Sequence, residues 1–377
     1  MSYSVLEKYI KKELSEGKTW EVIAEQLKQK PYCIDTNFLE EFALLKYNQI
    51  ESDFYNPLVK EARGIIFRKS TGNIVCHAFN KFGNYGEGYS DKIDWSSATV
   101  SEKVDGSIIK LWNAGGDLWR ISTNGTINAY TCPLPLESGN IKTFGDLWDS
   151  ITEGIDCTKL KTERTYIFEI TSLLNKVVVT HLENSIWYLG ERDTETGKEY
   201  FEEDTIKKFN CKTPKVFHLN SLEDCIETAK ILPFNEEGYV VKDKDYNRIK
   251  IKSPAYVSAH HLKNNGVVTK SRVLDLIDLG EKEEFLNYYP EYSEHFIEIE
   301  NKKMSFIDSL EEDKKKFEEF ISTKDDLTRK EIALFIQKNT NKLSFSFLFE
   351  LLDDKTFTIA KFYSSMSKTR KDSVLNL

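Results

Sequence analysis

Cysteines, histidines and long apolar runs are scarce in this chain of 377 residues, and each scarcity excludes a class of protein. The six cysteines are scattered and none forms a Cys-x-x-Cys pair, so they indicate neither a disulfide framework nor a zinc site. The adjacent pair His260-His261 has no third ligand beside it, which argues against a metal centre. No apolar run is long enough to cross a bilayer, and the charged N-terminal residues are not typical of a secretory signal. We therefore expect a protein without a membrane segment, in the cytoplasm of a cell or, for a viral chain, of its host. We also expect it to be a monomer.

A surplus of basic residues is also missing. Asp and Glu number 61 against 52 Lys and Arg, which gives a net charge of −9. The composition therefore does not indicate nucleic-acid binding, and any such site must be a local basic groove. The hydrophobic content of 40% and the charged content of 30% are ordinary for a globular protein, and the length suffices for two domains.

The hydrophobic pattern changes period twice along the chain. Residues 1–50 repeat apolar side chains at helical spacing. Strand patterns joined by short turns dominate from about residue 60 to 255, and helical patterns return after residue 258. We predict an α+β fold: a domain of antiparallel sheets flanked by helices over residues 1–257, with 1–50 as a helical lead-in, then an all-helical domain over 258–377. The predicted strands are 64–67, 74–76, 108–112, 118–122, 166–170, 176–180, 186–190, 238–241 and 248–252, with helices at 141–162 and 220–231 between them.

Lys103 lies between two apolar, β-prone segments and is followed by Val104-Asp105-Gly106. A lysine at a strand end has its amine on a fixed stem, and the glycine lets the backbone approach a nucleotide closely. This arrangement suits covalent catalysis, in which the amine attacks a phosphate. Because four residues also recur by chance, a surface lysine before a hairpin turn stays an alternative on this motif alone.

Further charged residues follow in a fixed order. Lys250 and Lys252 alternate with isoleucines, so both ammonium groups point to one face of a strand. They either improve solubility at an exposed edge or clamp phosphate beside Lys103. Glu169 lies inside an apolar strand, where it either faces solvent or binds a ribose hydroxyl or a hydrated metal ion in a cavity. Lysines for phosphate and glutamates for Mg²⁺ are what nucleotidyl transfer needs, since its transition state concentrates negative charge on the α-phosphate.

Five segments in this order resemble the motifs of the covalent nucleotidyltransferases, which include polynucleotide ligases and mRNA capping enzymes. The segments are 102–107, 122–125, 166–170, 236–240 and 250–252. Within that superfamily the chain is most similar to the ATP-dependent RNA ligases of the bacteriophage tRNA-repair type. Tyr47-Asn48, the Arg63-Gly64 strand start and Tyr256-Val257 after the fifth motif support this resemblance, which runs from residue 45 to 260.

The resemblance implies that RNA 5′-phosphate and 3′-hydroxyl ends, such as those of a cleaved tRNA, are joined through a lysyl-AMP enzyme and an adenylylated RNA. It implies that Lys103 is the nucleophile, that Lys250 assists the first step, and that Glu169 and Glu237 position the metal through water. The expected cofactors are ATP and Mg²⁺, with Mn²⁺ as an alternative metal. The residues that the resemblance assigns to nucleotide binding are Tyr47, Arg63, Lys81, Glu102, Gly106, Glu169, Glu237, Lys250 and Lys252.

Two positions depart from the family pattern, and other functions stay open. Asn124 stands where the second motif usually has a basic residue, and Gly83 stands where an aromatic residue usually follows Lys81-Phe82. One alternative is a different member of the superfamily, a DNA ligase or a capping guanylyltransferase, which would normally carry a β-barrel after the fifth motif. The other is a catalytically inactive nucleic-acid-binding protein, which would be expected to lose the nucleophile or its lysine partners.

Overall fold

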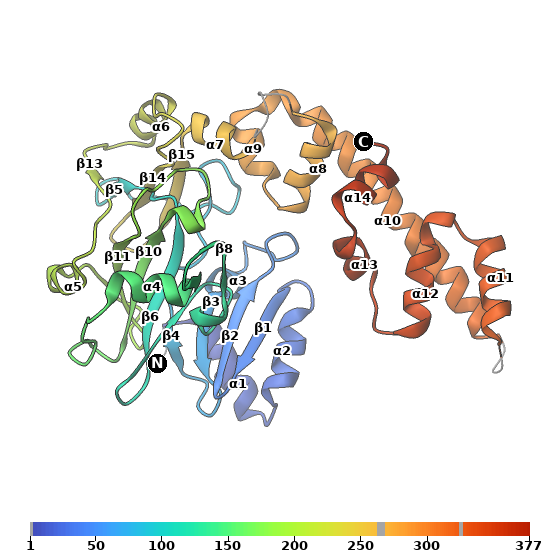
Figure 1. The fold of residues 1–377 in the computed structure, drawn as a ribbon, viewed down its shortest axis with the longest axis horizontal. Coiled ribbons are helices and arrows are strands. Elements are labelled where there is room, and N and C mark those ends of the chain that lie inside the picture. The colour runs from blue at the N-terminus through green and yellow to red at the C-terminus, as the bar shows by residue number, and fades with distance from the viewer. Residues whose placement is uncertain (1–2, 262–267, 324–326) are drawn as a thin grey trace. The chain divides into compact units, whose positions relative to one another are not determined.

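The computed structural model describes residues 3–261, 268–323 and 327–377. The chain divides into two compact units, residues 1–266 and 267–377 (Figure 1). The sequence places the domain boundary after residue 257, within helix α7 (Pro254–His261) of the first unit. Every helix among the described residues is too short or too polar to span a membrane.

The N-terminal sheet lies between two cores. Its strand order is β1-β2-β3-β4, all antiparallel. Ala43 and Leu45 pack in the same core as helices α1 and α2, whereas Phe42 and Leu44 on the opposite face pack against Trp112. The strands are β1 (Ile34–Leu39), β2 (Phe42–Tyr47), β3 (Arg63–Arg68) and β4 (Ile74–Cys76), and the helices are α1 (Val5–Ser15), α2 (Trp20–Lys28) and α3 (Pro57–Glu61).

The prediction of a helical lead-in over residues 1–50 is therefore right for α1 and α2 and wrong for residues 34–47, which form the β1–β2 hairpin. The hairpin turns at Glu40-Glu41, where Glu40 takes a φ of 50°. A two-residue hairpin turn with a positive φ at its first central position usually carries glycine there, so this sequence lacks the ordinary signal.

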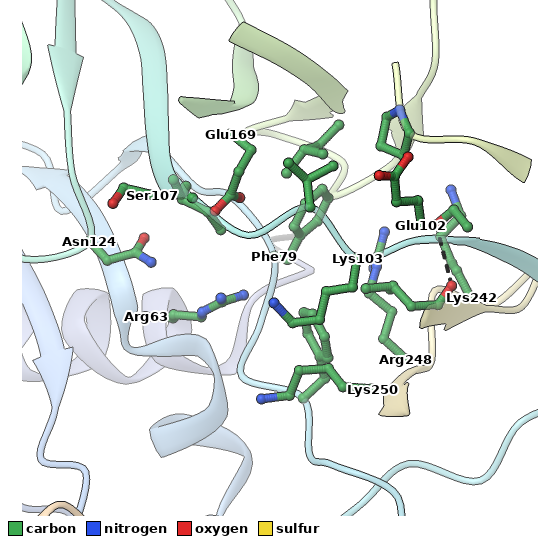
Figure 2. A pocket seen from close by; sticks show the side chains of 18 of the residues that line it. Arg63, Phe79, Glu102, Lys103, Ser107, Asn124, Glu169, Lys242, Arg248 and Lys250 are labelled. Carbon is green, nitrogen blue, oxygen red and sulfur yellow. Dashed lines mark hydrogen bonds between the residues drawn. The ribbon is translucent and has the colours of Figure 1, made fainter. Parts of the chain in front are cut away.

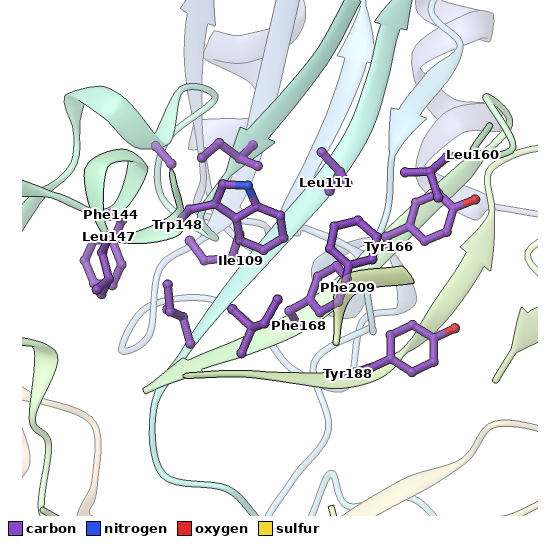
Figure 3. Packing of buried hydrophobic residues seen from close by; sticks show 14 of the residues in the cluster. Ile109, Leu111, Phe144, Leu147, Trp148, Leu160, Tyr166, Phe168, Tyr188 and Phe209 are labelled. Carbon is purple, nitrogen blue, oxygen red and sulfur yellow. The ribbon is translucent and has the colours of Figure 1, made fainter. Parts of the chain in front are cut away.

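A five-stranded sheet in the order β12-β11-β10-β6-β7 forms the centre of the first unit. Phe168 and Tyr188 from adjacent strands pack with Phe209 and Trp148, which come from helices on that face (Figure 3). The strands are β6 (Ser107–Gly115), β7 (Leu118–Ser122), β10 (Arg164–Thr171), β11 (Ser185–Asp193) and β12 (Glu199–Tyr200). Helices α4 (Phe144–Thr152) and α5 (Glu203–Phe209) and a small hairpin of β8 (Pro133–Ser138) and β9 (Ile141–Thr143) complete this region.

A third sheet, in the order β13-β5-β14-β15, carries Lys242, Lys250 and Lys252, and Lys103 follows its strand β5. Val100, Tyr239, Val241, Ile249 and Ile251 point to one face and form a core with helix α6, which leaves the alternate residues for the other face. The elements are β5 (Thr99–Glu102), β13 (Val216–Phe217), β14 (Gly238–Lys242), β15 (Arg248–Lys252) and α6 (Leu222–Lys230).

Most of the predicted hairpins are confirmed, and one predicted strand is wrong. Residues 176–180 are irregular, because the backbone N–H groups of Val178 and Val179 donate to the carboxylate of Asp105 instead of joining a sheet. The helix predicted over 141–162 is shorter, since α4 begins at Phe144 after the Thr143 cap and ends at Thr152.

The described residues of the second unit form helices joined by turns and short irregular segments. Its longest helix, α10, runs through residues Ser293–Ile321, and the capping box predicted at Thr328 and Glu331 begins α11. The α-helices are α8 (Lys270–Asp278), α9 (Lys282–Tyr288), α10, α11 (Arg329–Asn339), α12 (Phe345–Asp353), α13 (Ile359–Ser365) and α14 (Lys368–Leu375). The predicted α+β class, with antiparallel sheets followed by helices, is confirmed.

Candidate active site

A cavity of about 810 Å³ lies between the central sheet and the third sheet of the first unit. Its volume falls within the range of small-molecule sites. Figure 2 shows Arg63, Asn124 and Glu169 on one side of Lys103, and Glu102, Lys242 and Arg248 on the other. The residues that the sequence predicts for the site and that line this cavity are Arg63, Glu102, Lys103, Gly106, Glu169, Lys250 and Lys252.

Lys103 follows directly after β5, and its backbone and side chain are both held by the start of β14. The Lys103 N–H donates to the Gly238 carbonyl at 2.8 Å. Its ammonium lies 2.7 Å from Oε2 of Glu237, whose side chain is 4% exposed. Lys252 Nζ lies 3.7 Å from the other carboxylate oxygen of Glu237. One buried carboxylate therefore orients two of the predicted site lysines.

The turn after Lys103 is fixed by contacts from distant parts of the sequence. The Asp105 carboxylate accepts hydrogen bonds from Val178 N at 3.0 Å, Val179 N at 2.7 Å and the Tyr256 hydroxyl at 2.9 Å. A side chain at Gly106 has no room, since a Cβ there would lie 2.5 Å from the Ile170 carbonyl oxygen. The turn at residues 103–106 is therefore held against β10 and α7.

Glu169 extends from β10 into the cavity, as the sequence allows. Burial raises the pKa of its carboxyl to about 8; Lys103 opposes this rise and Glu237 adds to it. No hydrogen-bond or ion-pair partner for this carboxyl is found among the described residues. A polar side chain that is costly to bury and lies in a cavity is typical of a functional site.

Cationic side chains reach the cavity from three elements. The Arg63 guanidinium lies 5.2 Å and the Lys250 ammonium 5.7 Å from the ring centre of Phe82, so both cations share one aromatic side chain. Backbone bonds tie this segment to β15: Lys250 N donates to the Gly83 carbonyl at 3.0 Å, and Tyr85 N donates to the Lys250 carbonyl at 2.7 Å. Gly83, one of the departures from the family pattern, thus serves the pairing of this loop with the strand.

Two further cations line the cavity and were missed from the sequence. Lys242 and Arg248 lie on the same face of the β14–β15 hairpin as Lys250. Arg248 also donates to Glu199 at 2.9 Å and lies 4.3 Å from the ring centre of Phe79. The alternation that indicated Lys250 and Lys252 extends two residues further back, so the strand period could have indicated Arg248.

Tyr47 and Lys81, which the sequence also assigns to nucleotide binding, do not line the cavity. Lys81 is 8% exposed, and its ammonium lies 5.4 Å from the ring centre of Tyr47, 4.8 Å from that of Phe54 and 5.9 Å from that of Tyr89. The structure thus brings these two residues together in an aromatic cluster of their own.

A lysine after a strand, glutamates and several cations meet between antiparallel sheets, which is the arrangement that the resemblance to the covalent nucleotidyltransferases predicts. Residues 61–256, just over half of the chain, match the RNA ligase family. The chain belongs to the RNA ligase family.

Two sequence relatives agree with this assignment. A candidate bifunctional polynucleotide kinase/RNA ligase of Autographa californica nuclear polyhedrosis virus is 30% identical over 276 residues, which are 67% of this chain and 38% of that protein. An RNA ligase of Rhodothermus phage RM378 is 26% identical over 290 residues, 59% of this chain and 65% of that one. The solved structure of an archaeal ATP-dependent RNA ligase is similar with a TM-score of 0.45 and 13% identity, over 76% of this chain and 79% of that chain. The chain spans less than two thirds of the length of the two sequence relatives.

Proposed function

We propose that this chain is an ATP-dependent RNA ligase that joins an RNA 5′-phosphate to an RNA 3′-hydroxyl through a lysyl-AMP intermediate. The observation that carries the proposal is the position of Lys103. Its amine enters the same cavity as Arg63, Lys250 and Lys252, which come from other strands and can bind phosphate oxygens.

The reaction has three phosphoryl-transfer steps. In the first, Lys103 Nζ attacks the α-phosphorus of ATP, a P–N bond forms, the bond to the β-phosphate breaks and pyrophosphate leaves. In the second, an oxygen of the RNA 5′-phosphate attacks the same phosphorus, the P–N bond breaks and a 5′–5′ pyrophosphate linkage forms. In the third, the RNA 3′-hydroxyl attacks the RNA phosphorus, a phosphodiester forms and AMP leaves.

The residues around Lys103 fit these steps. The amine must lose a proton before it attacks, and Glu237 Oε2 is an acceptor that it already contacts at 2.7 Å. Arg63 and Lys250 stabilise the negative charge that develops on the phosphates, and this stabilisation is strongest where water is excluded. Gly106 lines the cavity beside Lys103, and the absence of a side chain lets the turn pack directly against β10.

Glu169 and Glu237 fit a divalent metal that substrate phosphates and water also hold. The described residues contain no group of three or more His, Cys, Asp or Glu side chains that could hold a metal alone. Mg²⁺ commonly takes only one or two carboxylates and fills its other positions with water and phosphate oxygens, and Mn²⁺ fits the same oxygen donors. When bound, such an ion would neutralise charge on the phosphates.

The helical second unit favours an RNA ligase over a DNA ligase or a capping guanylyltransferase. Those enzymes normally carry a β-barrel after the fifth motif, whereas the described residues from 268 onward are helical or irregular. Repair of a cleaved tRNA in the cytoplasm is the role that fits such an enzyme best.

A sealing assay tests the proposal. The protein is incubated with ATP, Mg²⁺ and a nicked RNA stem-loop with 5′-phosphate and 3′-hydroxyl ends, beside the same nick in DNA. We expect RNA sealing with transient adenylylated RNA, and no sealing by Lys103→Ala. DNA sealing alone would contradict the RNA assignment, and GTP in place of ATP as the only active nucleotide would indicate a guanylyltransferase.

A further inference from the structure

Lys110 is a lysine in the interior of the central sheet and has no role in the reaction above. It lies on β6 between Ser122 of β7 and Ile167 of β10, and it is 0% exposed. Its ammonium donates a hydrogen bond to the carbonyl oxygen of Gly64. No carboxylate lies within ion-pairing distance of it among the described residues. A buried ammonium without an anion is costly, so this one requires an explanation.

Gly64 occupies a β-bulge at the start of β3. Arg63 pairs with Lys46 and Ile65 pairs with Leu45, so Gly64 has no partner on β2, and it has none on β4 either. Its φ of +73° is a conformation that favours glycine. A bulge re-aims the neighbouring side chain and leaves backbone groups outside the ladder. The Gly64 carbonyl is such a group, and Lys110 binds it.

The bulge also determines the adjoining wall of the cavity. Arg63 precedes Gly64 and extends its guanidinium into the cavity (Figure 2). Nη1 of Arg63 and Oδ1 of Asn124 are both buried and have no hydrogen-bond partner among the described residues. Gly64 packs so closely on the loop at residues 123–126 that a Cβ would lie 2.6 Å from the Asn124 carbonyl oxygen. The bulge therefore fixes the backbone beside both polar groups, which a ligand in the cavity could bind.

We infer that Lys110 is a positioning residue: by binding the Gly64 carbonyl it holds the bulge in the form that aims Arg63 at a phosphate of ATP. The inference rests on the proposed function, because it takes ATP as the ligand of Arg63. A charged donor suits this task, since a charge-assisted hydrogen bond is about twice as strong as a neutral one. Burial lowers the pKa of Lys110, and the charge of Arg63 also lowers it, so the hydrogen bond to Gly64 offsets part of the cost of burying this ammonium.

The test is a double-mutant cycle between Lys110 and Arg63, measured by single-turnover adenylylation over a range of ATP concentrations. Lys110→Met keeps the side-chain volume and removes the donor. We expect about a tenfold rise in the ATP concentration for half-maximal rate and a smaller change in the maximal rate, in keeping with the loss of one charged hydrogen bond. In an Arg63→Ala background the same substitution should change that concentration less than about twofold, because coupled residues are not additive.

Controls separate this role from a general loss of stability. Lys8→Met removes an exposed lysine and should leave both parameters unchanged. Lys110→Gln keeps a neutral donor, should recover part of the ATP affinity, and carries the same cycle if Lys110→Met does not fold. The inference is overturned if Lys110 variants lower the melting temperature but leave ATP dependence intact, or if their effect is the same with and without Arg63. A wild-type protein that forms no adenylate would instead overturn the proposed function.

Discussion

Glu169→Gln should make the protein more stable at alkaline pH, because the carboxyl that it replaces is ionised there in an unfavourable place. The pKa of Glu169 is raised from 4.5 to about 8, first by burial. The folded state therefore holds a proton that the unfolded state releases between these two values, and wild-type stability falls as pH rises through that window. Glutamine resembles the protonated acid and does not titrate.

The magnitude follows from the shift. If solvent did not screen the carboxylate at all, the free energy of unfolding of the wild type would fall by about 4 to 5 kcal/mol above pH 8, at about 1.4 kcal/mol for each pH unit. Because Glu169 is only half-buried and lies in an open cavity, we expect about 2 kcal/mol after solvent screening. The free energy of unfolding is measured in urea at about pH 5 and about pH 8.5, without divalent metal, for wild type and variant.

The free energy of unfolding of the variant, relative to that of the wild type, should be higher at about pH 8.5 than at about pH 5. Glu163→Gln, which changes an exposed glutamate, should show no such change with pH. A difference between Glu169→Gln and wild type that stays constant across this range would refute the reasoning. Mg²⁺ with ATP should reduce the pH dependence of the wild type alone, since a bound cation favours the ionised carboxylate.

Two other changes test how the loops around the cavity are held. Gly64→Ala should lower the free energy of unfolding by about 2 kcal/mol or more and slow adenylylation. The new methyl group would meet the Asn124 backbone at 2.6 Å, and the residue would keep a positive φ. An unchanged melting temperature in calorimetry would contradict this prediction. Tyr256→Phe removes one of the three hydrogen bonds described above to the Asp105 carboxylate. It should lower the maximal adenylylation rate about tenfold with little change in ATP dependence. A selective loss of ATP affinity would contradict this and would place Tyr256 in the binding site.

The elements that the sequence predicts correctly are those with strong local signals. The hairpins at 64–76, 107–122 and 238–252 combine an alternating pattern with glycine, asparagine or aspartate at the turn, and the capping box at Thr328 begins a helix as predicted. The β1–β2 hairpin lacks such a turn. Residues 176–180 have a strand composition but bind Asp105, which is more than 70 residues away in sequence. The strand propensity of these five residues cannot predict a contact with so distant a residue.

The same distinction holds for the site. Lys103, Glu169 and the alternating lysines of β15 could be identified because strand period and motif order show which face they share. Lys110 could not, since a lone lysine in an apolar strand looks like a solvent-facing residue until the bulge at Gly64 is known. The aromatic cluster around Lys81 likewise depends on loops that the sequence does not place.

The measurement that tests the central claim most directly is peptide mapping of the protein after incubation with ATP, Mg²⁺ and pyrophosphatase. We predict one AMP per chain, attached through an acid-labile P–N bond to Lys103, and none on Lys103→Ala. Any AMP that the protein acquired during purification is removed beforehand. If the protein then gains no AMP, or gains it on another lysine, the account is contradicted.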